Sequence, residues 1–190
     1  MENAMSIPRL VSITGSYNRP SKTQALTGHI ASLIQARYAV ETSSYDLNDV
    51  GPSLGRALWR KDLDHQARQV VADIVAADLL LVGSPTYKGS YPGLFKHLFD
   101  LIDPLELRGK PVILTATGGG DRHALVVEHQ LRPLFGFFSA RTLPTAIYAS
   151  DVDFKDHRVA SARLAARFDD LLSDLSGLLP AVDKDVHHAA

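Results

Sequence analysis

Three short stretches of this chain combine residue types that bind phosphate groups and flat rings. The first, residues 15–23, reads GSYNRPSKT and follows the strand-like run Leu10–Thr14. A helical pattern of apolar residues begins directly after it, so the stretch is expected at a helix N-terminus. Unpaired backbone N–H groups and the positive end of the helix dipole attract anions there. The side chains that would assist are Ser16, Arg19, Ser21, Lys22 and Thr23.

The pattern of this stretch narrows the kind of anion. It does not match GxxxxGK[ST], the loop that surrounds nucleoside triphosphates. It does not match GxGxxG either, the first turn of a Rossmann dinucleotide site. A phosphomonoester such as that of FMN is therefore the predicted ligand. The competing interpretation is a capped turn with two solvated cations, and the position after the first strand of an α/β pattern favours the phosphate site.

The second stretch, residues 83–91, reads GSPTYKGSY and follows the continuous apolar run Leu79–Val82. Such a run is typical of a parallel strand that is buried on both faces. Pro92 and Gly93 then precede a helical pattern that extends to Ile102. The loop is thus expected at the carboxyl end of a strand, where open α/β sheets bind their ligands.

The third stretch, Thr115–His123, contains three consecutive glycines, which would let backbone approach a flat ligand. The competing interpretation is a flexible turn, and three glycines alone are weak evidence. This stretch follows the strand expected beside Leu79–Gly83, however. The second and third stretches would then form opposite sides of one slot, with the phosphate loop at its end.

The elements that position these loops alternate along the chain. Helices are expected at residues 26–34, 62–77, 94–102, 123–139 and 159–179. Strands are expected at residues 10–14, 40–47, 79–83, 111–117 and 143–149. This alternation predicts an α/β fold with a doubly wound, five-stranded parallel sheet in the order 2-1-3-4-5. We expect one domain at residues 10–179, a leader at residues 1–9 and a disordered or exchanged tail at residues 180–190.

Composition excludes several classes of function. The 190 residues are 45% apolar and have a net charge of −1, so no global field favours nucleic acid or an anionic membrane. The absence of cysteine excludes disulfides, thiolate metal sites and cysteine nucleophiles, and is compatible with the cytoplasm. No apolar run is long enough to span a bilayer. The chain has no HExxH metal motif and no GxSxG nucleophile motif, so we expect neither a metal centre nor a hydrolase.

The three stretches together resemble the flavodoxin-like NAD(P)H-dependent FMN reductases, over roughly residues 10–179. The resemblance rests on GSYNRPS, on PTYKGSYPGLFKHLFD, which is its most specific part, and on ATGG. More narrowly, ATGGGDRHALVVEHQLRPLFGFFSA resembles the FMN reductases of alkanesulfonate-utilisation systems, and the methanesulfonate branch most closely. The resemblance implies a homo-oligomer, dimer or tetramer, that reduces FMN with NADH or NADPH, NADH being favoured. Reduced FMN would pass to a separate monooxygenase that cleaves C–S bonds.

The resemblance also implies a set of cofactor-binding residues. The FMN phosphate would contact Ser16, Arg19, Ser21 and Thr23. The isoalloxazine ring would contact Pro85, Thr86, Tyr87, Lys88, Gly89 and Ser90, with Gly118, Gly119 and Asp121 opposite. Hydride passes between the two cofactors, so the protein supplies orientation and electrostatics and no catalytic acid or base is assigned.

Two other functions share this fold. A quinone or azo-dye reductase would retain FMN as a prosthetic group. A flavodoxin-type electron carrier would not oxidise a nicotinamide nucleotide itself. Flavodoxins are usually strongly acidic and have a TGxT-like phosphate loop, whereas this chain is nearly neutral and has Arg19 and Lys22 in its loop.

The fourth helical pattern is expected to be irregular around His129. Pro133 lies inside this pattern and has no N–H group to donate to the carbonyl of His129, four residues earlier. A π-helical turn is a common adaptation to such a conflict and is often found at functional sites. Alkanesulfonate reductases commonly have Tyr in a π-helical turn where this chain has His129. The long apolar series that follows exceeds what one sheet face needs, so part of it is expected to contact another subunit.

Overall fold

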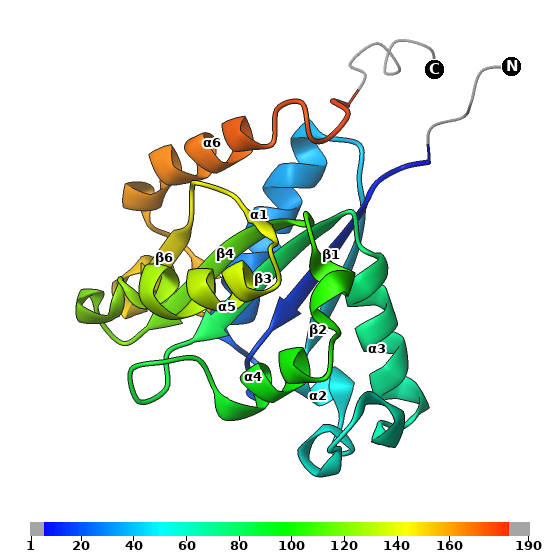
Figure 1. Ribbon diagram of the computed structural model, residues 1–190. Helices are drawn as coiled ribbons and strands as arrows, with labels where there is room; N and C mark the ends of the chain where they lie inside the picture. The colour runs from blue at the N-terminus through cyan, green and yellow to red at the C-terminus, as the bar shows by residue number, and fades with distance from the viewer. Residues whose placement is uncertain (1–5, 183–190) are drawn as a thin grey trace, which may run out of the picture.

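The computed structural model describes residues 6–182 and contains a parallel sheet with helices on both faces (Figure 1). The strands are β1 (Arg9–Thr14), β2 (Glu41–Asp46), β3 (Leu79–Pro85), β4 (Pro111–Gly118), β5 (Arg141–Thr142) and β6 (Ile147–Ser150). They pair in parallel in the order β2-β1-β3-β4, and β5 and β6 both pair with β4. The predicted α/β fold and strand order are confirmed, with two short strands at the fifth position.

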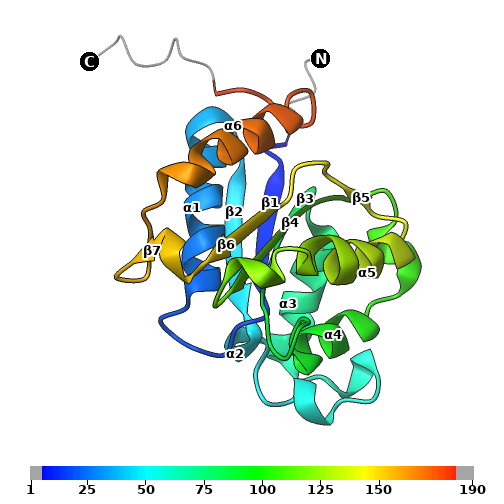
Figure 2. The same cartoon turned by 90° about the vertical axis from the view of Figure 1, so that its left-hand side faces the viewer.

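The helices form two layers around this sheet. Figure 2 shows α1 (Lys22–Arg37) and α6 (Ala165–Asp174) on one face, and α3 (His65–Ala76), α4 (Gly93–Asp100) and α5 (Arg132–Phe137) on the other. The short helix α2 (Leu47–Val50) follows β2 directly. Side-chain oxygens cap two of the longer helices: Ser21 accepts from the first turn of α1, and Asp64 from the first turn of α3.

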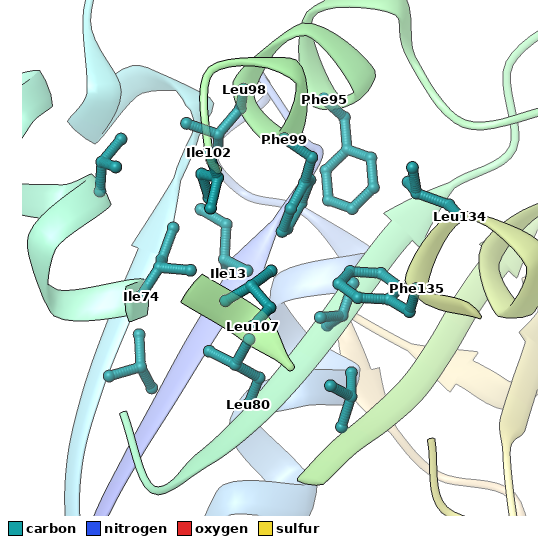
Figure 3. Packing of buried hydrophobic residues seen from close by; sticks show 14 of the residues in the cluster. Ile13, Ile74, Leu80, Phe95, Leu98, Phe99, Ile102, Leu107, Leu134 and Phe135 are labelled. Atoms are coloured by element: carbon teal, nitrogen blue, oxygen red, sulfur yellow. The ribbon is translucent and has the colours of Figure 1, made fainter. Parts of the chain in front are cut away.

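Successive residues of the strands pack against opposite layers, as the period of a strand requires. Val11, Ile13 and Val82 face α3, α4 and α5, whereas Leu10 and Leu81 face α1 and α6. Three fully buried aromatic rings join α4 to α5 in the first of these layers (Figure 3). The ring of Phe99 lies 5.0 Å from that of Phe95 and 4.9 Å from that of Phe135. This cluster fixes α4 against the sheet, and with it the loop that precedes α4.

The fifth strand is interrupted, which corrects the continuous strand expected at residues 143–149. Pro144 has no N–H group for a strand ladder. The polar backbone groups around it bind side chains instead: the carbonyl of Leu143 accepts from Arg132, and the N–H group of Thr145 donates to Asp174. The chain therefore leaves the sheet after β5 and returns at β6.

The helix expected at residues 159–179 is also shorter than predicted. Residues before it form an antiparallel hairpin of β7 (Phe154–Lys155) and β8 (Arg158–Val159). Asp156 and His157 form its turn with positive φ angles of 48° and 57°. A two-residue turn of this kind suits the twist of a hairpin, but its strands are too short for a periodic pattern.

The irregular fourth helix is confirmed. A three-residue turn at Asp121–His123 is followed by a π-helical turn at Val127–Leu131, and only then by α5. The N–H group of Arg132 donates to the carbonyl of Val127, five residues earlier. Pro133 therefore lies in the first turn of α5, where a missing N–H group costs little.

The ends of the expected domain are described only in part. Residues 180–182 run beside the end of α1, where the N–H group of Val182 donates to the carbonyl of Arg37. Residues 1–5 of the expected leader and residues 183–190 of the expected tail lie outside the described residues. Within residues 6–182, no helix has the length and apolar character needed to cross a membrane, and no metal-binding group of three or more side chains occurs.

Candidate functional site

The three predicted loops meet at the carboxyl edge of the sheet. The N–H group of Gly15 donates to the carbonyl of Gly83 at 2.8 Å, which joins the first loop to the end of β3. The N–H group of Thr86 donates to the carbonyl of Thr117 at 2.7 Å, which joins the second loop to the third. The hydroxyls of Thr23 and Thr117 lie 2.7 Å apart and are buried. The structure thus assembles the polar loops that the sequence placed on separate strands.

The first loop presents hydroxyls at the N-terminus of α1. The Ser21 hydroxyl accepts from the N–H group of Gln24 at 3.3 Å, and the Ser16 hydroxyl accepts from that of Asn18 at 3.2 Å. No acidic residue lies in the first turn of α1, so the positive end of its dipole is not neutralised there. The position of Gly15 in the first loop suggests close approach of a ligand, but the structure gives this residue a packing role. A Cβ at Gly15 would lie 3.0 Å from the Phe95 ring, so this glycine makes room for the core.

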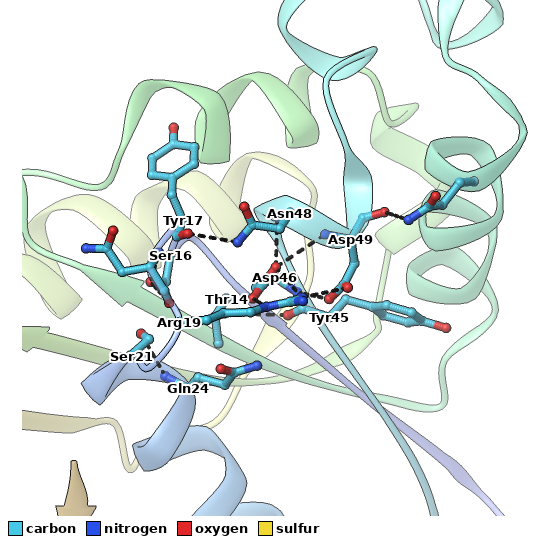
Figure 4. Close-up of polar contacts among 12 residues, drawn as sticks. Thr14, Ser16, Tyr17, Arg19, Ser21, Gln24, Tyr45, Asp46, Asn48 and Asp49 are labelled. Carbon is cyan, nitrogen blue, oxygen red and sulfur yellow. Dashed lines mark hydrogen bonds and ion pairs between the residues drawn. The ribbon is translucent and has the colours of Figure 1, made fainter. Parts of the chain in front are cut away.

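Arg19 is tied to two carboxylates below the first loop (Figure 4). Its Nε and Nη2 atoms donate to the two oxygens of Asp46 at 2.6 and 2.9 Å, and Nη2 also donates to Asp49 at 2.7 Å. The Asp46 side chain is fully buried and also caps α2. Burial acts to raise the pKa of Asp46, but hydrogen bonds from Arg19 and from two backbone N–H groups outweigh it, so the pKa lies below its ordinary value.

This arrangement indicates which atom of Arg19 is available for the predicted phosphate contact. Its Nη1 atom has no hydrogen-bond partner among the residues that the structure describes, and half of the side chain is exposed. We therefore expect Asp46 to orient the guanidinium so that Nη1 is free to bind a phosphate oxygen.

Replacing Arg19 by alanine should weaken the binding of FMN about ten- to hundredfold, because the phosphate loses a charged hydrogen-bond donor. The binding of riboflavin, which has no phosphate, should weaken much less. Fluorescence titrations with both flavins measure this difference. Asp49→Asn is the matched control, since it weakens the ion pair but keeps the guanidinium. Equal losses for FMN and riboflavin in Arg19→Ala would count against a phosphate contact.

The second loop turns tightly at Lys88 and Gly89, whose φ angles are 53° and 86°. Tyr87 and Ser90 flank this turn and exchange backbone hydrogen bonds of 2.8 and 3.1 Å. The hydroxyl of Ser90 donates to the side-chain oxygen of Gln130 in the π-helical turn at 2.9 Å. The turn exposes the ring of Tyr87 and holds the other residues of the loop in a defined shape.

Thr86 has a side-chain hydroxyl that is well placed to bind a polar ligand atom. Its Oγ1 atom is buried and has no hydrogen-bond partner, and it is the only such side-chain atom found within residues 6–182. A buried hydroxyl without a partner is costly in a finished structure. The Thr86 hydroxyl lies 3.4 Å from where a Cβ on Gly118 would be, so it stands at the meeting point of the second and third loops. A polar edge of a ring bound between these loops would supply its partner.

The third loop is held from outside. The Tyr148 hydroxyl donates to the carbonyl of Gly120 at 2.6 Å, and the Arg163 guanidinium donates to both oxygens of Asp121. These hydrogen bonds from Arg163 lower the pKa of Asp121. A Cβ at Gly119 would meet no atom within 4 Å, so this residue leaves the loop surface open.

The predicted site residues therefore fall into one region. Ser16, Arg19, Ser21 and Thr23 lie at the end formed by the first loop and the start of α1, and the other members, which lie along the second and third loops, are Pro85, Thr86, Tyr87, Lys88, Gly89, Ser90, Gly118, Gly119 and Asp121. Sequence reasoning missed Asp46, Gln130, Tyr148 and Arg163. Asp46 lies at the end of β2, which is a signal that could have indicated it, whereas Tyr148 lies within β6. Gln130 and Arg163 carry no such signal.

This region fits a phosphorylated flavin on its own geometry. A helix N-terminus with hydroxyls occupies one end, and the open backbone of the third loop faces the second loop near a buried hydroxyl that has no partner. FMN needs these two elements, an anion site and a slot for a flat polar ring. The residues present therefore fit FMN, and their assignment to individual atoms of it remains a prediction.

Comparison with known proteins identifies a family. Residues 8–155 match the family model described as NADPH-dependent FMN reductase. An FMN reductase (NADPH) of Pseudomonas aeruginosa is 47% identical over 84% of this chain and 86% of its own length. An NADH-dependent FMN reductase, SfnF, of Pseudomonas fluorescens is 47% identical over 86% of this chain and 88% of its own.

Solved structures agree with the fold. An NADH:FMN oxidoreductase named EmoB, in its apo form, is 26% identical and superimposes with a TM-score of 0.74 over 90% of each chain. Flavodoxins are among the structures that share the fold, which confirms the flavodoxin-like class expected from the sequence.

Proposed function

Because this chain belongs to the family of NADPH-dependent FMN reductases, we propose that it reduces FMN as a substrate that leaves the protein afterwards. FMN accepts a hydride from NADH or NADPH and carries it away in reduced form. The chain's own residues bind and orient: the first loop takes the phosphate, and the second and third loops take the ring. The observation that supports flavin binding most strongly is the buried Thr86 hydroxyl, which has no hydrogen-bond partner and lies where the second and third loops meet.

The role of the product follows from the narrower resemblance. We propose that reduced FMN supplies a monooxygenase that cleaves the C–S bond of a sulfonate. The segment that supports this is ATGGGDRHALVVEHQLRPLFGFFSA, which includes the third loop and the π-helical turn. NADH is the favoured donor, in line with the name of the relative from Pseudomonas fluorescens, although the relative from Pseudomonas aeruginosa is named for NADPH. We place the reaction in the cytoplasm, where reduced nicotinamide nucleotides are regenerated.

A groove between α4 and α5 supports self-association. Its volume is about 660 Å³, and its lining includes Phe99, His129, Pro133 and Phe138. Phe137 at its rim is 72% exposed, which is unusual for so large an apolar side chain. We propose that a second copy of this chain covers the groove and that the protein is a dimer or tetramer. Sedimentation of Phe137→Ser should show a lighter species than the unaltered protein. A substitution elsewhere on the surface, such as Val152→Ser, should leave the sedimenting mass unchanged.

If FMN is a substrate, the purified protein should be almost colourless and its rate should saturate with added FMN. The physical reason is that the chain has no cysteine to form a covalent bond to the flavin, and the ring slot consists largely of exposed loop residues. Absorbance after gel filtration and the rate of NADH oxidation at increasing FMN measure the two properties. Stoichiometric yellow FMN that stays bound, together with no reduction of free FMN, would instead indicate a quinone or azo reductase.

A further inference from the structure

The third loop has little beneath it to fix its shape. Gly118, Gly119 and Gly120 have no side chains to pack, and the backbone of glycine loses more freedom on ordering than that of any other residue. A cavity of about 530 Å³ adjoins the end of the loop, and Asp121, Tyr148 and Arg163 are among its lining residues. Packing against a core therefore does not order the loop on this side. Something else must hold it in the shape that faces Thr86.

Tyr148 of β6 supplies one anchor. Its hydroxyl donates to the carbonyl of Gly120 at 2.6 Å. A Cβ built on Gly118 would lie less than 3.0 Å from the Tyr148 hydroxyl oxygen. One hydroxyl thus touches both ends of the three-glycine segment. Burial raises the pKa of Tyr148, and the nearby carboxylates of Asp121 and Asp151 raise it further, so the hydroxyl keeps its proton and remains a donor at neutral pH.

Arg163 supplies a second anchor, which is itself fixed to the core. Its Nη1 and Nη2 atoms donate to Asp121 at 3.2 and 3.0 Å. Its Nε and Nη2 atoms donate to Asp153 at 2.5 Å each, and Nη2 also reaches the Ser150 hydroxyl at 2.9 Å. The Asp153 side chain is fully buried, and Arg163 lowers its pKa to about 2. Asp153 therefore fixes Arg163, and Arg163 fixes the end of the loop.

We propose that Tyr148 is a positioning residue for flavin reduction: it holds the three-glycine loop in the shape that receives the ring, and Arg163 is the second anchor. The inference rests on the proposed function, because it assumes that a flavin ring is what the loop receives. Tyr148 and Arg163 act through the loop, since their bonds end on Gly120 and Asp121. The alternative is that both residues only join the C-terminal segment to the sheet and affect stability alone.

Tyr148→Phe separates these two roles. It removes one hydroxyl and one hydrogen bond to a carbonyl, so the KM for FMN should rise about three- to tenfold. The kcat at saturating FMN should change less than twofold. Riboflavin should show the same factor as FMN, because the loop faces the ring and not the phosphate.

Tyr38→Phe is the matched control. The Tyr38 hydroxyl donates to the carbonyl of Leu172 at 2.7 Å and joins the end of α1 to α6, away from the three loops. This control loses the same kind of hydrogen bond, so its Tm should fall as in Tyr148→Phe while its KM stays unchanged. An unchanged KM in Tyr148→Phe, or an equal rise in Tyr38→Phe, would overturn the proposal.

Hydrogen exchange tests the anchor without any flavin chemistry. Backbone amides of residues 118–121 should exchange faster in Tyr148→Phe than in the unaltered protein, and at an unchanged rate in Tyr38→Phe. If the unaltered protein fails to reduce FMN, the proposed function fails, and this measurement still decides whether Tyr148 orders the loop. Should Tyr148→Phe not fold, Arg163→Lys takes its place, since it keeps the charge but loses the forked contact. The same rise in KM and in exchange is expected, and no change in either would overturn the proposal.

Discussion

Replacing Gly118 by alanine should remove most of the flavin reduction at low FMN, with a rise in the KM for FMN of about tenfold or more. The added Cβ would lie less than 3.0 Å from the Tyr148 hydroxyl and 3.4 Å from that of Thr86. Overpacking of this kind costs about 1–3 kcal/mol, and the cost is placed on the loop that faces the ring. Steady-state kinetics with FMN as the varied substrate measure the effect.

Gly28→Ala is the control for this prediction, because a Cβ there meets no atom within 4 Å, its backbone is not in the left-handed region, and it lies in α1 outside the three loops. Its KM should stay within about threefold of the unaltered value, by the same overpacking argument. The double variant Gly118→Ala with Tyr148→Phe removes the oxygen that the new methyl group meets, so it should recover part of the loss. Equal effects of Gly118→Ala and Gly28→Ala would show that the close approach of Tyr148 does not matter.

Deleting His129 should abolish most of the steady-state turnover while FMN still binds. The deletion removes the extra residue of the π-helical turn at Val127–Leu131 and restores a regular helical register. Leu131 and Phe135 are buried in the core, so the residues before them must rotate. The hydrogen bond from Ser90 to Gln130 should then be lost or displaced, and with it the link between the second loop and this turn.

The deletion should also weaken the oligomer, because His129 and Gln130 line the groove that we assign to a second copy. His129→Ala is the matched control, since it removes the ring but keeps the number of residues and the π-helical turn. Turnover, FMN titration and sedimentation distinguish the two variants. An unaltered oligomer and a normal release of reduced FMN after the deletion would mean that the π-helical turn is only a structural adaptation to Pro133.

Much of this architecture follows from local sequence. The runs Leu79–Val82 and Pro111–Leu114 are apolar throughout because both faces of their strands are covered, and this made the sheet predictable. The π-helical turn was predictable because Pro133 forbids one hydrogen bond at one position. The interrupted fifth strand was not, because side chains of Arg132 and Asp174 from two other elements bind the backbone there.

Within the site, the loops were predictable and their supports were not. Asp46 meets Arg19 only because β1 and β2 pair with Thr14 opposite Asp46, which sets a contact 27 residues apart in the chain. Tyr148 reaches the third loop only because β6 pairs with β4 at the register Gly118 to Ser150. Such contacts depend on strand register and on side-chain direction, and local patterns in a single sequence predict neither of them.

The most direct test of the account is an oxygen-free reaction with excess FMN and either NADH or NADPH. Reduced FMN is measured after the protein is removed by ultrafiltration. We expect many equivalents of reduced FMN per protein in the filtrate, with one mole of nicotinamide nucleotide oxidised for each. A nicotinamide nucleotide that remains reduced would indicate an electron carrier, and reduction limited to one retained equivalent would indicate a prosthetic flavin. Either result would contradict the proposal that this protein is a reductase that releases its flavin.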